Sequence, residues 1–197
     1  MQGLHFLRTC DPDLAQILTK LGPPPMWARE PGFPALILII LEQQVSLASA
    51  RAAYARLLKT VSPLTPTRFL KLNDVKLRAI GFSRQKTAYC RNLARAIVSR
   101  RINLNTLDSM DDTTVRSELI KVKGIGPWTA DIYLLMVLRR PDIWPKKDLA
   151  LAVAVQRIKQ LALRPTPDEL DFISRGWKPW RAVAARLLWH YYLSDRV

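Results

Sequence analysis

The chain has 197 residues, 49% of them hydrophobic, which is enough for one sizeable core or for two small lobes that share one. Its 31 Lys and Arg outnumber its 16 Asp and Glu, and the net charge of +15 favours a polyanion such as nucleic acid as partner, although an acidic membrane surface would attract it too. The densest apolar run, Ala35 to Leu41, is far shorter than the roughly 20 residues of a membrane helix, and no secretory signal pattern is visible, so we expect neither a membrane protein nor a secreted one.

Helix signals dominate the sequence, and the alternating pattern of a half-buried strand is almost absent. Each expected helix opens at a residue whose side chain can cap it, or at a proline that suits its first turn. In chain order, these starts are Asp11-Pro12, Pro34, Ser46, Thr65-Pro66, Asn73, Ser83, Asp111 or Asp112, Pro127, Asp148, Thr166-Pro167 and Pro179. Roughly ten short helices joined by tight turns predict an all-α protein.

We expect these helices to form two lobes. Residues 1–30 and about 150–197 would pack together as the terminal lobe, and residues 31 to about 149 would form a central lobe with a helix–hairpin–helix at 112–139. A central cleft between two such lobes is a natural place for a functional site.

The most informative segment is VKGIGPWTADIYLL, residues 122–135. Gly124 and Gly126 allow a tight turn whose amides can approach a ligand closely, and Pro127 suits the first position of the next helix. The free N–H groups of such a helix start attract an anion. On the two glycines alone, a plain helix connection is as good an interpretation, but Thr129 and the basic chain around the turn favour the DNA backbone. Neither a P-loop nor a dinucleotide-binding fingerprint is present.

The pattern Gly-Ile-Gly-Pro-Trp-Thr-Ala, followed by an apolar helix, resembles the helix–hairpin–helix DNA glycosylases, and within them the 3-methyladenine DNA glycosylase II branch. Further segments match that branch in its order along the chain. They are Phe33-Pro34-Ala35-Leu36 with Glu42-Gln43-Gln44-Val45-Ser46, Gly81 to Lys86, Trp144-Pro145 through Leu151, and Trp177 to Arg181 with Ala184, Ala185, Leu188 and Trp189. The resemblance implies an all-α, two-lobed fold and the excision of damaged bases from double-stranded DNA.

Asp148 matches the catalytic aspartate of that family. Cleavage of an N-glycosidic bond builds positive charge on the sugar, which a fixed carboxylate in a poorly hydrated site can stabilise. The alternative is that Asp148 only caps its helix, and the two roles can coexist. Lys147 departs from the family pattern and could act on Asp148 or contact a phosphate, while Asp131 matches a structural position.

Trp128 occupies the position where the relatives that also nick the strand carry a lysine for a Schiff base. Because an indole has no amine, we expect a monofunctional enzyme that uses water and leaves an abasic site. The resemblance also assigns Trp128 and Trp189 to the base pocket, with Tyr133 as a neighbour. Each tryptophan taken singly suits core packing, and we interpret Trp27 and Trp180 as core.

Gln44 matches the family's intercalating residue, which fills the gap that an extruded base leaves in the stack. For Gln43, DNA contact and a polar turn bonded to backbone are equally good interpretations. Lys86 begins a basic helix near the hairpin and is the best single candidate for a phosphate contact.

The function that these features predict is excision of alkylated purines, such as 3-methyladenine and 7-methylguanine. Two alternatives stay open: the same fold acting on deaminated or other lesions, and a helix–hairpin–helix module that binds DNA without catalysis. Cys10 and Cys90 form no metal-binding spacing, so we expect free thiols and no metal. We expect no cofactor beyond a monovalent cation that the family allows at the hairpin carbonyls, a monomer, and a location in the cytoplasm and nucleoid or in a nucleus.

Overall fold

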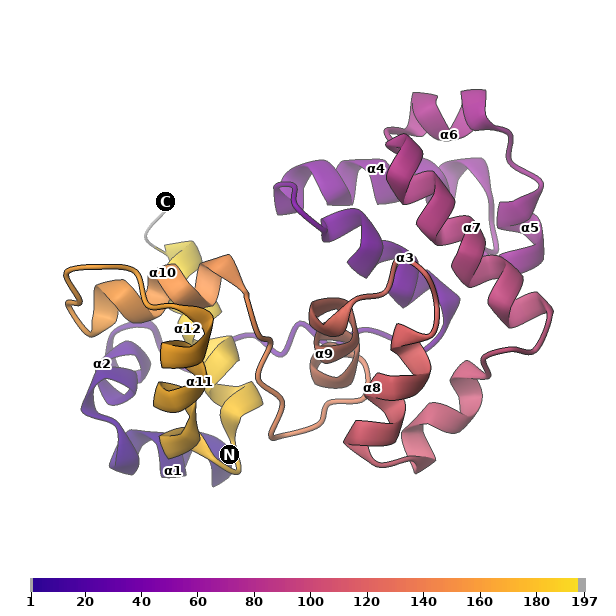
Figure 1. Ribbon diagram of the computed structural model, residues 1–197. Helices are drawn as coiled ribbons and strands as arrows, with labels where there is room; N and C mark the ends of the chain where they lie inside the picture. The colour runs from indigo at the N-terminus through magenta and orange to yellow at the C-terminus, as the bar shows by residue number, and fades with distance from the viewer. Residues whose placement is uncertain (1, 195–197) are drawn as a thin grey trace. The chain divides into compact units, whose positions relative to one another are not determined.

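The computed structural model describes residues 2–194, which form helices and no β-strand (Figure 1). An all-α fold is therefore confirmed over this range. The α-helices are α1 (Gln2–Cys10), α2 (Pro12–Leu21), α3 (Phe33–Glu42), α4 (Leu47–Thr60), α5 (Pro66–Leu70), α6 (Asp74–Ile80), α7 (Arg84–Val98), α8 (Asp112–Ile120), α9 (Pro127–Met136), α10 (Leu149–Ile158), α11 (Pro167–Ser174) and α12 (Arg181–Ser194). Two short 3-10 helices, η1 (Leu104–Ser109) and η2 (Arg175–Trp177), complete them. No helix among these is both long and apolar enough to cross a bilayer.

Side-chain caps fix most of the helix starts, as the sequence predicts. In each case an oxygen of the residue before the helix accepts a hydrogen bond from a backbone N–H of the first turn. The capping residues are Asp11, Ser46, Thr65, Asn73, Ser83, Asp111, Asp148 and Thr166. The sequence missed α1 and η1, and the last helix begins at Arg181 rather than at Pro179.

The chain folds into two compact units, residues 29–138 and residues 1–28 with 139–197. The chain enters the second of these at Arg139, earlier than the residue 150 that the sequence suggested, so Asp148 belongs to the terminal unit.

In the unit of residues 29–138, α3 is the central element. It is apolar along nearly its whole length, and its buried positions run from Phe33 to Glu42. Helices α4, α7 and α9 pack around it, and α8 packs against α9 (Figure 1). The dense apolar run from Ala35 to Leu41 is therefore the buried core helix of this unit.

In the terminal unit, α12 packs against α10, α2 and α1. Its small residues Ala182, Ala184 and Ala185 are fully buried, which allows neighbouring backbones to approach closely. The rings of Trp144 and Trp177 meet edge to face with their centroids 5.4 Å apart.

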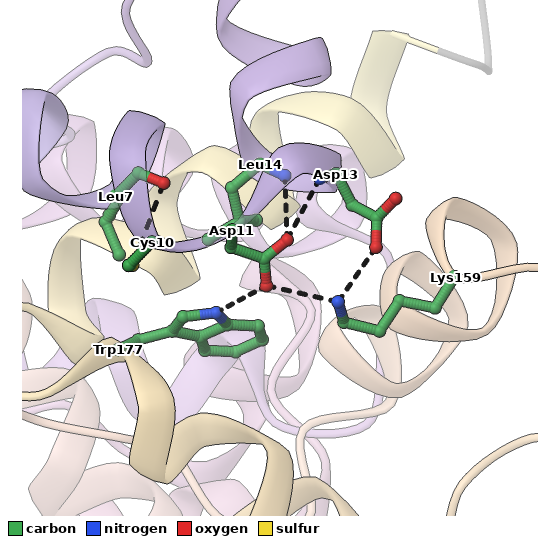
Figure 2. A network of polar contacts seen from close by, with 7 residues as sticks. All are labelled: Leu7, Cys10, Asp11, Asp13, Leu14, Lys159 and Trp177. Carbon is green, nitrogen blue, oxygen red and sulfur yellow. Dashed lines mark hydrogen bonds and ion pairs between the residues drawn. The ribbon is translucent and has the colours of Figure 1, made fainter.

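A buried carboxylate ties the terminal unit together at Asp11 (Figure 2). Its Oδ1 caps α2, while its Oδ2 accepts hydrogen bonds from the Trp177 indole N–H at 2.8 Å and the Lys159 ammonium at 3.1 Å. Lys159 also reaches Asp13 at 2.9 Å. Burial by itself raises the pKa of Asp11, but the donors of Trp177 and Lys159 outweigh it, so the pKa lies below its usual value.

Replacing Asp11 by Asn tests this network, because Asn keeps the capping oxygen and puts an N–H group where Oδ2 accepts from Trp177 and Lys159. We expect the free energy of unfolding to fall by about 2 kcal/mol near neutral pH, since buried donors lose a charged acceptor. Because the pKa of Asp11 is lowered in the folded protein, the stabilisation is complete above pH 3.8, the pKa of this carboxyl in the unfolded chain. It is lost as the pH falls through the lower pKa of the folded state. Urea unfolding at about pH 5.5 and pH 3 measures both effects.

The matched control is Asp111→Asn, which alters another capping aspartate, on α8, that is exposed. It should leave the unfolding midpoint nearly unchanged. Equal losses in the two variants would mean that capping alone accounts for the role of Asp11.

Candidate functional site

The hairpin between α8 and α9 contains a glycine, Gly124, whose backbone conformation and close packing leave no room for a side chain. Gly124 has φ +107°, and a Cβ there would lie 2.3 Å from Cγ of Tyr89 on α7. Gly126, which precedes Pro127 at the start of α9, has φ −93° and open space at its Cβ position. Gly124 is therefore required by the turn and its packing, while Gly126 leaves open space beside the start of α9.

Gln43 holds the turn after α3 against this hairpin. Its side-chain amide donates to the Thr129 hydroxyl at 2.8 Å and to the Gly124 carbonyl at 3.2 Å. Thr129 is 2% exposed, so its side chain faces inward. Of the two interpretations of Gln43, the polar turn bonded within the protein is the one that the structure supports. The side chains of Gln43 and Thr129, both candidates for DNA contact, are hydrogen-bonded to each other.

Two further contacts fix the same turn. The Lys86 ammonium donates to the Leu41 carbonyl at the end of α3, and burial lowers the pKa of this lysine. The Arg29 guanidinium makes a bidentate pair with the buried Glu42 carboxylate, at 2.9 and 2.8 Å. Lys86, the best candidate for a phosphate contact by sequence, thus has at least one N–H committed to the protein.

The residue that emerges from this anchored turn is Gln44. Its backbone has φ +55°, in the left-handed region, and its side chain is exposed. Val45 and Leu47 beside it are also exposed, at 45% and 40%. A tip of one amide and two apolar side chains on a rigid base has the form expected of a wedge.

Asp148 is the N-cap of α10 and is 8% exposed. Its Oδ1 accepts hydrogen bonds from the Leu151 backbone N–H at 2.9 Å and from the Trp189 indole N–H at 3.2 Å. The capping role considered from the sequence is confirmed, and a donor from α12 adds to it. Lys147 before it is exposed and has φ +64°.

The other expected site residues separate into exposed and buried ones. Trp128, in the first turn of α9, is partly exposed. Tyr133 is 0% exposed in the core around α3, where burial raises the pKa of its hydroxyl. Asp131 is buried and accepts from Arg116 on α8 at 2.7 and 2.8 Å, which confirms its structural role.

The structure thus brings the expected residues together in two groups. The turn after α3, the hairpin and Lys86 form one group, and Asp148 with Trp189 forms the other. Sequence reasoning missed the partners Arg29 and Glu42, because opposite charges 13 positions apart in different segments carry no local signal. It also assigned Trp27 to the core, where the structure gives a partly exposed ring in contact with Trp189.

A family model described as HhH-GPD superfamily base excision DNA repair protein matches residues 37–179. The chain belongs to this superfamily. The matched range contains the hairpin, the anchored turn and Asp148, whereas Trp27 and Trp189 lie outside it.

Among curated HhH-GPD relatives, the putative DNA-3-methyladenine glycosylase YfjP of Bacillus subtilis is 28% identical over 94% of this chain and 66% of its own length. A DNA-3-methyladenine glycosylase of the same organism is 33% identical over 66% of this chain and 40% of its own length. The chain thus spans less than two thirds of these relatives. The solved 3-methyladenine DNA glycosylase Mag1 of Schizosaccharomyces pombe, in complex with abasic DNA, has a TM-score of 0.91 at 22% identity, covering 100% of this chain and 98% of that one, which shows a shared fold.

A pair of glycine substitutions tests the account of the hairpin. Gly124→Ala combines a left-handed backbone with a clash against the Tyr89 ring, so we expect it to lower the free energy of unfolding by more than about 2 kcal/mol. Gly126→Ala meets open space at an ordinary φ and should cost less than about 1 kcal/mol. Denaturant unfolding of both variants measures the difference, and similar values would contradict the assigned geometry.

Proposed function

We propose that this protein is a monofunctional DNA glycosylase that excises alkylated purines from duplex DNA and leaves an abasic site. The observation that carries the proposal is the Asp148 carboxylate, nearly buried and held by N–H donors from α10 and α12 in a chain of the HhH-GPD superfamily.

The chemistry follows from where the negative charge is fixed. As the bond between base and sugar breaks, positive charge develops on the sugar, and a carboxylate that is already oriented stabilises it without reorganising. The backbone N–H of Leu151 at the start of α10 and the indole N–H of Trp189 hold this carboxylate in one orientation. The same carboxylate can orient the water that attacks the sugar.

Two features support duplex DNA as the substrate. The first turn of α9, which has no side-chain cap, suits a backbone phosphate, and the anchored tip at Gln44 suits insertion where a base has left the stack. The chain's net charge of +15 supplies the attraction that does not depend on sequence.

Trp128 supports hydrolysis without strand cleavage. Its indole stands where a lyase of this fold would need an amine to form a Schiff base. Water is then the nucleophile, and the sugar–phosphate backbone stays intact.

The names of the relatives and the chemistry of the leaving base support alkylated purines as the substrate class. Both curated relatives carry the name DNA-3-methyladenine glycosylase. N-alkylated purines such as 3-methyladenine and 7-methylguanine are already cationic in DNA, so they leave without a strong general acid, and aromatic side chains attract them.

Asp148→Asn tests catalysis directly, because asparagine caps a helix as well as aspartate does and the fold should be preserved. With duplexes that carry a single 7-methylguanine, we expect excision to fall at least about 100-fold while DNA binding is retained. Release of the base is measured by chromatography, and strand cleavage is measured separately without heat or alkali.

Full activity in Asp148→Asn would remove the acid from its proposed role. Strand cleavage by the untreated wild-type reaction would contradict the monofunctional assignment. A wild type that binds DNA but releases no base from any lesion duplex would favour the non-enzymatic DNA-binding module.

Gln44→Ala tests the wedge. Truncation should slow excision from a fully paired duplex by about tenfold, because the gap left by the extruded base stays unfilled. The loss should shrink when the lesion faces a mismatched base, since less pairing energy must then be overcome. Single-turnover rates on the two duplexes measure this, and equal losses on both would contradict a wedge role for Gln44.

A further inference from the structure

Trp27 lies beside the acid-bearing group of the terminal unit in an unusual conformation. Its backbone has φ +46°, in the left-handed region, and its ring is partly exposed. The ring meets that of Trp189 edge to face, with centroids 6.4 Å apart and planes at 72°. A bulky residue rarely adopts this backbone, so the surrounding structure must hold it there.

The contact that holds it comes from α12. The buried Arg186 guanidinium donates to the Met26 carbonyl at 3.0 Å, immediately before Trp27. Burial lowers the pKa of Arg186 to about 10, which still leaves it charged at neutral pH. Arg186 and Trp189 lie three positions apart on α12, so one helix fixes the backbone next to Trp27 and provides the ring against which it packs.

This arrangement leaves Trp189 with little surface for a ligand. It is 8% exposed, its N–H is used by Asp148, and Trp27 packs against its ring. Trp27 is partly exposed, and only the ring of Trp189 separates it from the Asp148 carboxylate.

We propose that Trp27 is the aromatic side chain of this unit that contacts the extruded base, and that Trp189 is a positioning residue for Asp148. The proposal rests on the proposed glycosylase function and reverses what the sequence suggested for these two residues. The ligand class is a planar purine that carries positive charge after N-alkylation, because an indole face attracts such a ring by stacking and by cation–π attraction.

The experiment compares single-turnover excision of cationic 7-methylguanine and neutral hypoxanthine by wild type, Trp27→Ala, Trp27→Phe and Trp189→Phe. Trp27→Ala should slow excision of the cationic base about tenfold more than that of the neutral base, and Trp27→Phe should restore most of the loss. Trp189→Phe keeps an aromatic ring and removes the N–H, so it should slow excision of both lesions by the same factor.

Trp180→Ala is the matched control. It removes another partly exposed tryptophan of the same unit, whose ring lies beside Gly3. Its excision rates should keep the wild-type ratio between the two lesions. Equal slowing of both lesions by Trp27→Ala, or a selective loss in Trp189→Phe, would overturn the assignment.

Binding of the free nucleoside separates this inference from the proposed function. Saturation-transfer NMR should show that 7-methylguanosine contacts the wild type more strongly than guanosine does, and that Trp27→Ala loses this difference. If the wild type excised no lesion yet showed this selective contact, the glycosylase proposal would fail and the base site at Trp27 would stand. Undiminished selective contact in Trp27→Ala would overturn the site.

Discussion

The hydrogen bonds to one oxygen of Asp148 are the constraint on which the proposed chemistry depends. A carboxylate at the start of a helix is ordinarily satisfied by its own first turn, as the Leu151 N–H satisfies this one. The added indole N–H of Trp189 comes from α12, far along the chain, and restricts the direction in which the acid points. An acid that must act on charge developing at a single atom benefits from this, because misplacement by even 1 Å weakens its effect.

The other unit also holds one functional candidate in a fixed position, here the neutral side chain of Gln44. The end of α3 and the turn after it are fixed at three successive residues. Lys86 binds the Leu41 carbonyl, Arg29 pairs with Glu42, and the Gln43 side chain donates to the hairpin. The strained Gln44 follows directly, so the flexibility that a loop tip would ordinarily have is removed at its base. Gln43 also joins the turn to the hairpin, which links the proposed wedge and the proposed phosphate site in one rigid structure.

The sequence predicted the features that depend on residues close together along the chain, such as the starts of helices. Caps such as Asp11, Ser83 and Thr166 were identified because a capping oxygen acts on N–H groups two or three residues later. It did not predict partners that only the fold brings together. The pair of Arg29 with Glu42 and the contact of Trp27 with Trp189 have no local signature. The short helix η1 was missed although Asn103 caps it. The Asp148 position came from family resemblance, while its second donor came from the structure.

The cations that are committed inside the protein have a consequence for how it would respond to ionic strength. Arg29, Arg116 and Lys159 neutralise carboxylates, and Arg186 and Lys86 serve carbonyl groups. Only basic groups that displace condensed counterions from phosphates contribute to the slope of log K against log salt, at about 0.9 per contact on duplex DNA. The count of 31 Lys and Arg therefore overstates the number of ions that this protein would release on binding. Its affinity for DNA should fall less steeply with added salt than that count suggests.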